Sequence, residues 1–505
     1  MKQLFLGFCL GAMALAGCSA GQQLESLVPD TPSAAPDYFC TWSTQAYLIN
    51  HDGHEPQRKM MTEANIFGDG PYQNWASFFP AIRQDLFFVM DDSWDIPADV
   101  NTRDNEYLGT TILDTTRFPS FTGTPTERLQ KLNRKFKDMG WKGAGGWICA
   151  QKAGIYADAE EEAYWTERLK AAHDAGIGYW KVDWGRNARN GEWRKKLTEL
   201  GKKYAPNLWM EHAMDYEFIE FSDAYRTYDV EYILAQAPTI RRITDLLPYK
   251  AKDGAKGIIN CEDEPYIAVG LGCAIGIMRH PFAGKLPNGV QDEAFPPIGH
   301  NYKQCLDELT RAVRWHRIAE PFGVDGVYEM DTVKLNDWWT LAEYETWNRG
   351  RKSGSVMRDS APARVSRHMA LPEVADTASN RPYMLASAYP NGAVALAAIG
   401  RALDREYITK EVPVTIEGKD WEAPLGLFGR FQKVTVVYPS APSGKVQVLA
   451  QDLAGDTPVD ITAEVKLDGN RLVIPGEVIN RVGLMAATAG DLSDPGMVVQ
   501  MKTEQ

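Results

Sequence analysis

The sequence of 505 residues lacks features that would point to several common classes of protein. After the N-terminal segment, no run reaches the roughly 18 uninterrupted apolar residues that a membrane-spanning helix needs. No G-x-G-x-x-G follows an early apolar run, so the dinucleotide-binding signature is missing. Basic residues are outnumbered 67 to 54, which gives a net charge of −13. Because phosphate binding needs a basic face, this balance argues against a nucleic-acid partner.

Cysteine is scarce and widely spaced, with seven residues and no C-x-x-C pair. Neither a zinc site nor a disulfide framework fits this spacing. Two of the seven, Cys9 and Cys18, lie in the N-terminal segment. We expect most of the other five to be buried thiols, and the sequence leaves one bridge between two of them open.

The N-terminus has the pattern of a processing segment rather than of a folded element. MKQ is followed by an apolar run over residues 4–17 and then by Cys18. LAGC resembles a bacterial lipoprotein box, with 1–18 as signal peptide and Cys18 as the lipidated residue. An ordinary signal peptide with a chance cysteine is the alternative. Lipidation predicts an exported protein at the cell envelope, held to a membrane only by its lipid anchor, with 19–37 as a tether.

Short apolar segments alternate with helical patterns between residues 38 and 322. A typical predicted helix follows Thr124 as cap, begins at Pro125 and ends at Gly140. Repeated strand–helix units form parallel sheets, and eight of them predict a (β/α)8 TIM barrel at 38–322. The eight predicted strands are 39–45, 86–94, 145–151, 178–184, 208–214, 224–231, 257–262 and 271–278.

The last part of the chain has a different texture. From residue 381, short alternating runs separated by Gly- and Asn-containing turns predict a C-terminal antiparallel β-sandwich at 381–505. Residues 323–380 show no clear period, so we expect an irregular segment that bridges the two domains. The sequence therefore predicts an α/β chain with a TIM barrel followed by a β-sandwich.

The stretch GYWKVDWG, residues 178–185, places two opposite charges among aromatic residues. Lys181 and Asp183 are two apart, so they share one face of the predicted strand. In barrels of this kind the chemistry lies where the strands end. Any one of these residues alone could belong to a structural ion pair or a turn, but their shared position favours an active site. The other predicted strand ends contribute Asp91, Asp92, Glu211, Arg226 and Asp229.

Paired carboxylates of this kind suit glycoside hydrolysis, in which one attacks or activates water and the other protonates the departing oxygen. Asp183 suits the nucleophile, because nearby Lys181 would keep it ionised. Asp229, two strands later, could face it across the barrel mouth. A separation of about 5–5.5 Å would predict retention of configuration, and a wider one inversion. Aromatic rings that could stack on a sugar are Trp42, Trp94 and Trp184.

Two other polar clusters have weaker patterns. HDGHE, residues 51–55, contains His51 and His54 and allows a metal-dependent hydrolase as an alternative, but two histidines in a loop are a weak signal, and we predict no metal site. The acidic run Glu262–Glu264 could touch substrate, but we favour the alternative that it is a solvated loop.

DDSW at 91–94 and YWKVDW at 179–184 resemble motifs of the α-galactosidase clan, glycoside hydrolase families 27 and 36. The resemblance implies an exo-acting, retaining enzyme that releases terminal α-D-galactose from a glycan without a cofactor. It implies Asp183 as nucleophile and Asp229 as acid/base. The residues that it implies for sugar binding are Trp42, Asp91, Asp92, Trp94, Lys181, Glu211 and Arg226.

The chain departs from the family pattern at two places. Trp184-Gly185 stands where the family usually has Asn-Cys after the nucleophile. Arg226 precedes Asp229 by three residues rather than four, which makes Asp223 a rival for the acid/base role. Alternative functions are a β-L-arabinopyranosidase or another related-sugar hydrolase of the clan, and a glycan-binding lipoprotein without catalysis. The oligomeric state is not predicted.

Overall fold

The computed structural model describes residues 24–100, 105–227, 234–282, 285–289, 305–342 and 352–504. The predictions for the signal peptide and Cys18 lie outside the described residues, as does the prediction for Asp229.

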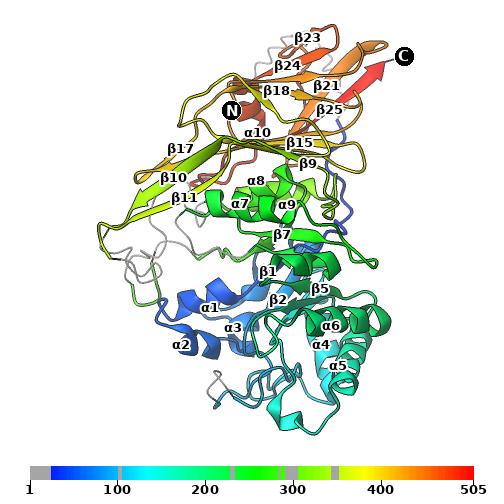
Figure 1. Cartoon of the computed structure of the whole chain (residues 1–505), viewed down its shortest axis with the longest axis vertical. Coiled ribbons are helices and arrows are strands. Elements are labelled where there is room, and N and C mark those ends of the chain that lie inside the picture. The colour runs from blue at the N-terminus through cyan, green and yellow to red at the C-terminus, as the bar shows by residue number, and fades with distance from the viewer. Residues whose placement is uncertain are drawn as a thin grey trace, which may run out of the picture.

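Eight parallel strands close into a barrel in the first half of the chain, as the sequence predicts (Figure 1). Each predicted segment overlaps one of them. They are β1 (Tyr38–Cys40), β2 (Phe87–Met90), β3 (Gly143–Ile148), β4 (Tyr179–Val182), β5 (Trp209–His212), β6 (Ala224–Arg226), β7 (Ile258–Glu262) and β8 (Ala274–Ile277).

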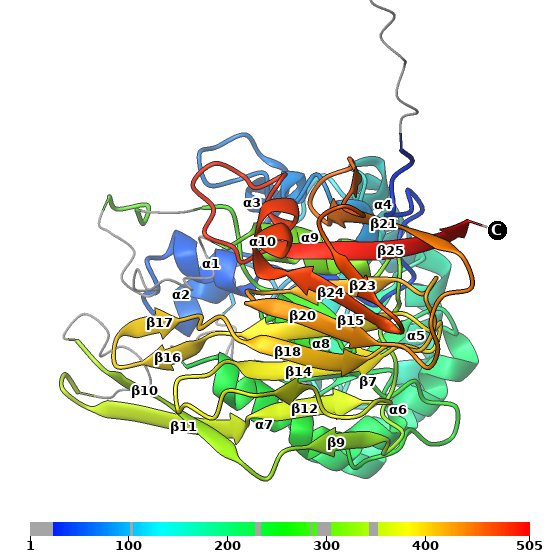
Figure 2. The ribbon, with the colours of Figure 1, turned by 90° about the horizontal axis from the view of Figure 1, so that it is seen from above.

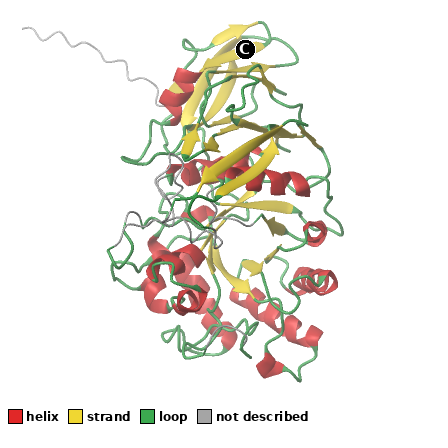
Figure 3. Cartoon of the chain, turned by 60° about the vertical axis from the view of Figure 1, so that its left-hand side comes forward, coloured by secondary structure: helices red, strands yellow, loops and turns green. Residues whose placement is uncertain are grey.

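Helices surround the barrel and pack against its outer face (Figure 3). They are α1 (Trp42–Leu48), α2 (His54–Lys59), α3 (Glu63–Phe67), α4 (Pro125–Asp138), α5 (Glu161–Ala175), α6 (Gly191–Tyr204), α7 (Gln236–Leu246), α8 (Pro265–Gly270) and α9 (Asp307–Trp315). Short 3₁₀ helices lie at η1 (Trp75–Ser77), η2 (Arg83–Asp85), η3 (Gly154–Tyr156) and η4 (Tyr216–Phe221).

The local sequence explains where these helices begin and end. Thr124 and Glu127 form a reciprocal capping box at the start of α4, which satisfies two backbone N–H groups that would otherwise lack partners. Asn190 caps α6 by accepting from the Trp193 N–H. α5 stops at Gly176, whose φ of +70° is a left-handed conformation that glycine adopts without strain. Each helix therefore ends before the next barrel strand begins.

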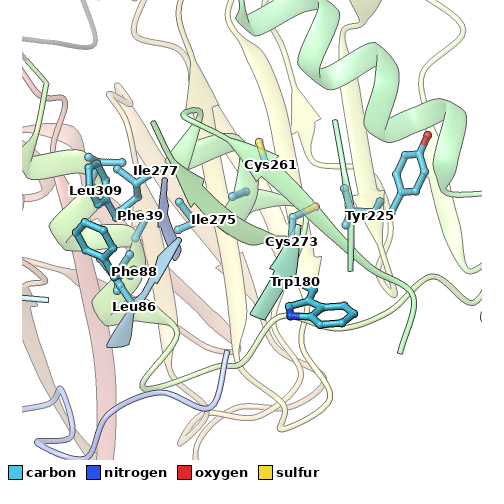
Figure 4. Close-up of a cluster of buried hydrophobic side chains, with 14 of the residues drawn as sticks. Phe39, Leu86, Phe88, Trp180, Tyr225, Cys261, Cys273, Ile275, Ile277 and Leu309 are labelled. Atoms are coloured by element: carbon cyan, nitrogen blue, oxygen red, sulfur yellow. The ribbon is translucent and has the colours of Figure 1, made fainter. Parts of the chain in front are cut away.

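The apolar core lies between the barrel strands and these helices. Phe39 of β1, Phe88 of β2 and Ile275 of β8 point outward, and Leu309 of α9 covers them (Figure 4). Alternate strand residues point the other way, into the barrel. The lumen thus receives a separate set of side chains, and it is these that form the candidate site.

The first predicted strand is too long at its C-terminal end. Only Tyr38–Cys40 is extended, and α1 follows at once. The residues Ser43, Thr44 and Gln45 are all buried, so the alternation that a strand needs is missing. A helical turn instead lets the Gln45 N–H donate to the Thr41 carbonyl at 2.9 Å.

The C-terminal half forms three sheets above the barrel (Figures 1 and 2). An eight-stranded sheet packs on a five-stranded one across a shared apolar core, which confirms the predicted sandwich. Most strand pairs are antiparallel, whereas β10–β16, β12–β14, β15–β19 and β18–β20 pair in parallel. In Figure 1, α7, α8 and α9 lie between the barrel and the sheets.

The strands and helix of this half are β9 (Tyr328–Met330), β10 (Lys334–Thr340), β11 (Val356–Pro362), β12 (Arg364–Arg367), β13 (Glu373–Val374), β14 (Tyr383–Ala388), β15 (Val394–Ile399), β16 (Arg401–Leu403), β17 (Glu406–Ile408), β18 (Pro413–Glu417), β19 (Leu425–Phe428), β20 (Lys433–Val437), β21 (Lys445–Asp452), β22 (Val459–Asp460), β23 (Lys466–Asp468), β24 (Arg471–Pro475), α10 (Gly476–Gly483) and β25 (Gly496–Glu504).

The prediction of an irregular bridge at 323–380 is wrong, because β9 to β13 lie there and join the C-terminal sheets. In β10 the inward residues are Leu335, Asp337 and Trp339, so the period is two. The pattern is hidden in the sequence because one inward position is an aspartate. Asp337 is buried against the Arg401 guanidinium at 2.5 Å, a partner 64 residues away.

The predicted tether at 19–37 is wrong for its described part. Residues 24–37 lie along the folded protein, with Val28 buried in the main core. The Ser33 N–H donates to the Asp85 carboxylate at 2.8 Å, and Lys142 Nζ donates to the Ala35 carbonyl at 2.6 Å. The Ser- and Pro-rich composition predicts a tether, but apolar contacts and hydrogen bonds hold this stretch against the folded protein.

The cysteines that the structure describes are buried, as the sequence predicts for most of them. The five cysteines of the described part, Cys40, Cys149, Cys261, Cys273 and Cys305, are all buried free thiols. Across the described ranges, no helix combines the length and the apolar character needed to cross a membrane.

Candidate active site

Charged side chains fill the carboxyl end of the barrel lumen. Asp91 follows β2, Lys181 lies on β4, Glu211 on β5, Arg226 on β6 and Glu262 on β7. Each is at most 4% exposed. Ionised groups buried this deeply must be paired, because leaving water costs several kcal/mol for each of them. The lumen therefore holds connected ion pairs rather than an apolar core at this end.

One network centres on Lys181. Its Nζ lies 3.0 Å from Asp91 Oδ2 and 3.8 Å from Glu262 Oε1. The Cys40 thiol donates to the same Asp91 oxygen at 2.8 Å, and Tyr38 donates to Glu262 at 3.2 Å. Burial alone would lower the pKa of Lys181, but the neighbouring acidic groups, Asp91 first, raise it well above its ordinary value. Lys181 is thus a fixed cation between β2 and β7.

A second network centres on Arg226. Its Nη2 contacts Asp183 Oδ1 at 2.6 Å, and its Nη1 donates to Glu211 Oε1 at 3.1 Å. Tyr179 donates to the other Glu211 oxygen at 2.7 Å. Burial raises the pKa of Glu211, with Arg226 acting in the opposite direction. Arg226 thus pairs with two carboxylates at once, Asp183 just after β4 and Glu211 on β5.

Asp183 is the carboxylate of this set that reaches the barrel mouth. It follows β4, and its side chain is 13% exposed. Trp147 of β3 donates its indole N–H to Asp183 Oδ2 at 2.9 Å, while Arg226 holds Oδ1. Both oxygens of Asp183 are therefore held by neighbouring side chains.

The prediction that Lys181 is the cation beside Asp183 is wrong. The two residues share a strand face, but Lys181 extends across the lumen to Asp91 and Glu262. Asp183 lies one step past the strand end and meets Arg226 instead. Spacing along one strand predicts a shared face; which partner each charge finds depends on the strands opposite.

Asp91 and Asp92 lie together, but their surroundings differ. Asp91 accepts from Lys181, Cys40 and the Asp92 backbone N–H. Asp92 accepts from Arg58 Nε at 2.7 Å and from the Ser93 hydroxyl at 2.9 Å. Burial raises the pKa of Asp92 to about 6, although Arg58 lowers it. Asp92 is therefore a carboxyl group that titrates near neutrality.

The three tryptophans predicted to stack on sugar lie in different surroundings. Trp94 is buried in the main core and donates to the Trp147 carbonyl at 2.8 Å, so it supports the Asp183 strand end from behind. Trp42 begins α1, is partly exposed, and has the His54 ring 5.6 Å away. Trp184 is partly exposed, with its ring 5.4 Å from that of Trp147.

Asp223 is not placed to work with Asp183. It precedes β6, whereas Asp183 follows β4, so the two lie at opposite ends of a parallel barrel. Its Oδ2 accepts from the Met210 backbone N–H at 3.2 Å. The alternative acid/base residue is therefore wrong. Asp229 lies outside the described residues, two positions after Thr227 at the carboxyl end of β6.

Sequence reasoning missed several residues of this site. Glu262 was grouped with a solvated loop, yet it is the last residue of β7 and points into the lumen. The alternation Asn260, Glu262 on that strand is the signal that could have found it. Cys40, Tyr38 and Trp147 gave no chemical signal, because their roles depend on partners from other strands. Arg58 comes from α2, in a segment without any recognised motif.

The histidines of HDGHE do not form a recognisable metal centre. His54 begins α2 and packs edge-on against Trp42, and the His51 ring lies 6.5 Å from that of Tyr47. In the part of the chain that the structure describes, no group of three or more His, Cys, Asp or Glu side chains is arranged to hold a metal ion.

Comparisons with known proteins give structural similarity only. No protein-family model matches the sequence, and no curated protein matches it. A solved α-galactosidase I from Mortierella vinacea matches with a TM-score of 0.39 and 10% identity, over 93% of this chain and 97% of that one. A family 27 β-L-arabinopyranosidase from Geobacillus stearothermophilus matches with a TM-score of 0.39 and 10% identity, over 93% of this chain and 96% of that one.

An α-amylase from Geobacillus thermoleovorans has a TM-score of 0.42 and 9% identity, over 93% of this chain and 99% of that one. An α-galactosidase, a β-L-arabinopyranosidase and an α-amylase thus match with TM-scores of 0.39 to 0.42.

Proposed function

We propose that the protein is an exo-acting glycoside hydrolase with a retaining mechanism, which releases terminal α-D-galactose or a sugar of the same ring stereochemistry from a glycan. The observation that carries the proposal is Asp183. It is a carboxylate at the barrel mouth, with one oxygen held by Arg226 and the other by the Trp147 indole. A nucleophile needs this combination of negative charge, fixed orientation and access.

In the proposed first step, Asp183 attacks the anomeric carbon and the bond from that carbon to the leaving oxygen breaks. An acid donates a proton to the leaving oxygen, and a covalent glycosyl ester forms on Asp183. In the second step water attacks the same carbon, the acid, now a base, takes its proton, and Asp183 is released. Asp229 is the proposed acid/base, since it follows the strand end that carries Arg226.

Sugar binding is proposed for the charged groups around Asp183. Lys181 pairs with Asp91, and Arg226 pairs with both Asp183 and Glu211. Asp92 is next to Asp91 in the chain. Ionic hydrogen-bonding groups that are held in place before the substrate arrives lose little entropy on binding it. Trp42 and Trp184, both partly exposed, are the proposed apolar surfaces for the sugar ring.

The test is hydrolysis of aryl glycosides by the form that lacks residues 1–18, with Asp183→Ala in parallel. The panel contains α-D-galactoside, β-L-arabinopyranoside, N-acetyl-α-D-galactosaminide and α-D-glucoside. Release from the galactoside that disappears in Asp183→Ala would support the proposal, and NMR of the first product would show whether configuration is retained. Preference for the arabinopyranoside would favour the related-sugar alternative.

A glycan-binding protein would give a different result. It would bind galactose in a calorimeter, hydrolyse none of the four glycosides, and keep its affinity after Asp183→Asn. The proposed site of action is the cell envelope, with Cys18 as lipid anchor. In a host that lipidates proteins, Cys18→Ala should move the full chain from the membrane fraction to the soluble fraction.

A further inference from the structure

Arg58 lies at the edge of the candidate site, and its two terminal nitrogens have no acceptor among the described residues. It lies on α2, and its side chain is 10% exposed. Its Nε donates to Asp92 Oδ2 at 2.7 Å. Among the described residues, no oxygen accepts from Nη1 or Nη2. One edge of the guanidinium is therefore bound to the protein, and the other edge still has its donors available.

Hydrogen bonds from neighbouring segments fix the position of Arg58. Its carbonyl accepts from Arg117 Nη1 at 3.2 Å, which fixes the end of α2. The neighbouring residue Gln57 donates to the Trp42 carbonyl at 2.9 Å, and Gln45 donates back to the Gln57 carbonyl at 3.3 Å. α2 is thus tied to α1, and Arg58 is not a surface side chain that moves freely.

The same guanidinium lies beside the residue next to the proposed nucleophile. The Arg58 Cζ is 5.5 Å from the centroid of the Trp184 ring, within cation–π distance. Trp184 in turn packs on Trp147, which hydrogen-bonds to Asp183. Arg58 and Trp184 therefore lie side by side near Asp183, and Trp184 is a position where the chain departs from the clan it resembles.

The terminal nitrogens of Arg58 are not among the buried side-chain atoms that lack a partner, so they face solvent rather than the protein interior. Guanidinium donors that face solvent beside a site are available to a ligand. A carboxylate can accept from both terminal nitrogens of one guanidinium in parallel, which is the strongest common geometry for such a pair. A neutral hydroxyl would satisfy fewer of the available N–H groups.

We propose that Arg58 is a specificity-determining residue that binds the carboxylate of an acidic sugar, so that the preferred glycone is a hexuronate such as α-D-galacturonate. The inference rests on the proposed glycosidase function and narrows its substrate class. Galactose and galacturonate share every ring centre and differ only in the group at carbon 6, so they form a matched pair.

The experiment measures kcat/KM for the aryl α-D-galactoside and the aryl α-D-galacturonide. The inference predicts that the intact site prefers the galacturonide. Arg58→Met should lower kcat/KM for the galacturonide by roughly 10- to 100-fold, the effect of losing a charged hydrogen bond, and change the galactoside much less. Arg58→Lys keeps the charge and the Asp92 contact but loses the parallel N–H donors of the guanidinium. It should therefore give an intermediate preference for the galacturonide over the galactoside. Arg189→Met removes an exposed arginine nearby and serves as the control.

Two outcomes would overturn the inference. One is an equal loss for both glycosides in Arg58→Met, because Arg58 would then only position Asp92. The other is an enzyme that hydrolyses the galactoside and neither hydrolyses nor binds the galacturonide. Calorimetry with free galacturonic acid and Asp183→Ala separates the two proposals. Binding that depends on Arg58, with no hydrolysis of either glycoside by the intact site, would reject the proposed function and keep this inference.

Discussion

The two ends of the barrel are both rich in buried carboxylates, but they use them differently. At the amino end, Asp37 accepts from the Ile275 N–H at 2.8 Å and pairs with His316 Nδ1 at 2.6 Å. Asp85 accepts from the Ser33 N–H and from the Arg317 guanidinium. These groups connect strand starts to the backbone and to residues just after α9.

At the carboxyl end, the carboxylates bond mainly to other side chains within the lumen. Asp91, Glu211 and Glu262 pair with Lys181 or Arg226, and Asp183 extends from this network to the mouth. Burial and ion pairing are thus common to both ends. The difference is that the carboxyl-end network leads to a partly exposed carboxylate, Asp183, whereas Asp37 and Asp85 at the amino end are fully buried. This is what separates a candidate site from structural ion pairs.

The largest effect is expected from substitutions that compare the two ends directly. Asp183→Asn should lower kcat by roughly 10⁴-fold, because the amide cannot act as nucleophile. Its matched control is Asp223→Asn at the amino end, which should leave kcat unchanged. Steady-state hydrolysis of an activated aryl glycoside measures both. An equal loss in the two variants would contradict the assignment of function to one end.

Arg226→Met should have the next largest effect. It leaves Asp183 and Glu211 without their cation, so the pKa of the nucleophile should rise and the acid limb of kcat/KM should move to higher pH. Removing one partner of a buried ion pair also costs about 3–5 kcal/mol of unfolding free energy. pH–rate profiles and urea unfolding test the two parts. An unchanged acid limb would mean that Arg226 does not control Asp183.

Gly185→Ala should reduce stability by a smaller amount. Gly185 has φ +142°, and a Cβ there would lie 2.8 Å from the Ala150 backbone nitrogen. The expected cost is roughly 1–3 kcal/mol, with Trp184 displaced from Arg58. Gly254→Ala is the control, since φ is +74° but nothing lies within 4 Å of the added carbon. Thermal unfolding of the two variants should therefore separate the stability cost of backbone strain alone from the cost of strain combined with a steric clash.

The last effect is spread over several pH units and concerns pH-dependent stability at the carboxyl end. Burial raises the pKa of Asp95 to about 7, above the value near 3.9 expected in an unfolded chain. The folded state then binds the proton more tightly, so stability falls as pH rises from about 4 to about 7, by at most ~1.4 kcal/mol per pH unit. Asp95→Asn should flatten the stability curve over this range. A curve that keeps its slope would show that Asp95 is ionised in the folded protein.

The sequence predicts the barrel well because its signals are local. Apolar strands, capped helices and the polar residues after each strand all lie within a few positions of one another. The lumen is different, since Lys181 meets Asp91 and Arg226 meets Asp183 across strands that are 40 or more residues apart in the chain. Arg58 and Asp337 were missed for the same reason: each is explained only by a distant partner.

The central claim, that Asp183 is the nucleophile, can be tested most directly by trapping the covalent intermediate. A fluorinated galactosyl fluoride that slows the second step would label the enzyme, and trypsin would release residues Val182–Arg186. Asp183 is the only side-chain carboxylate in that peptide. The account predicts that mass spectrometry finds the glycosyl adduct on it and that Asp183→Asn abolishes the label. Turnover with the adduct on another peptide, or with no adduct, would contradict the account.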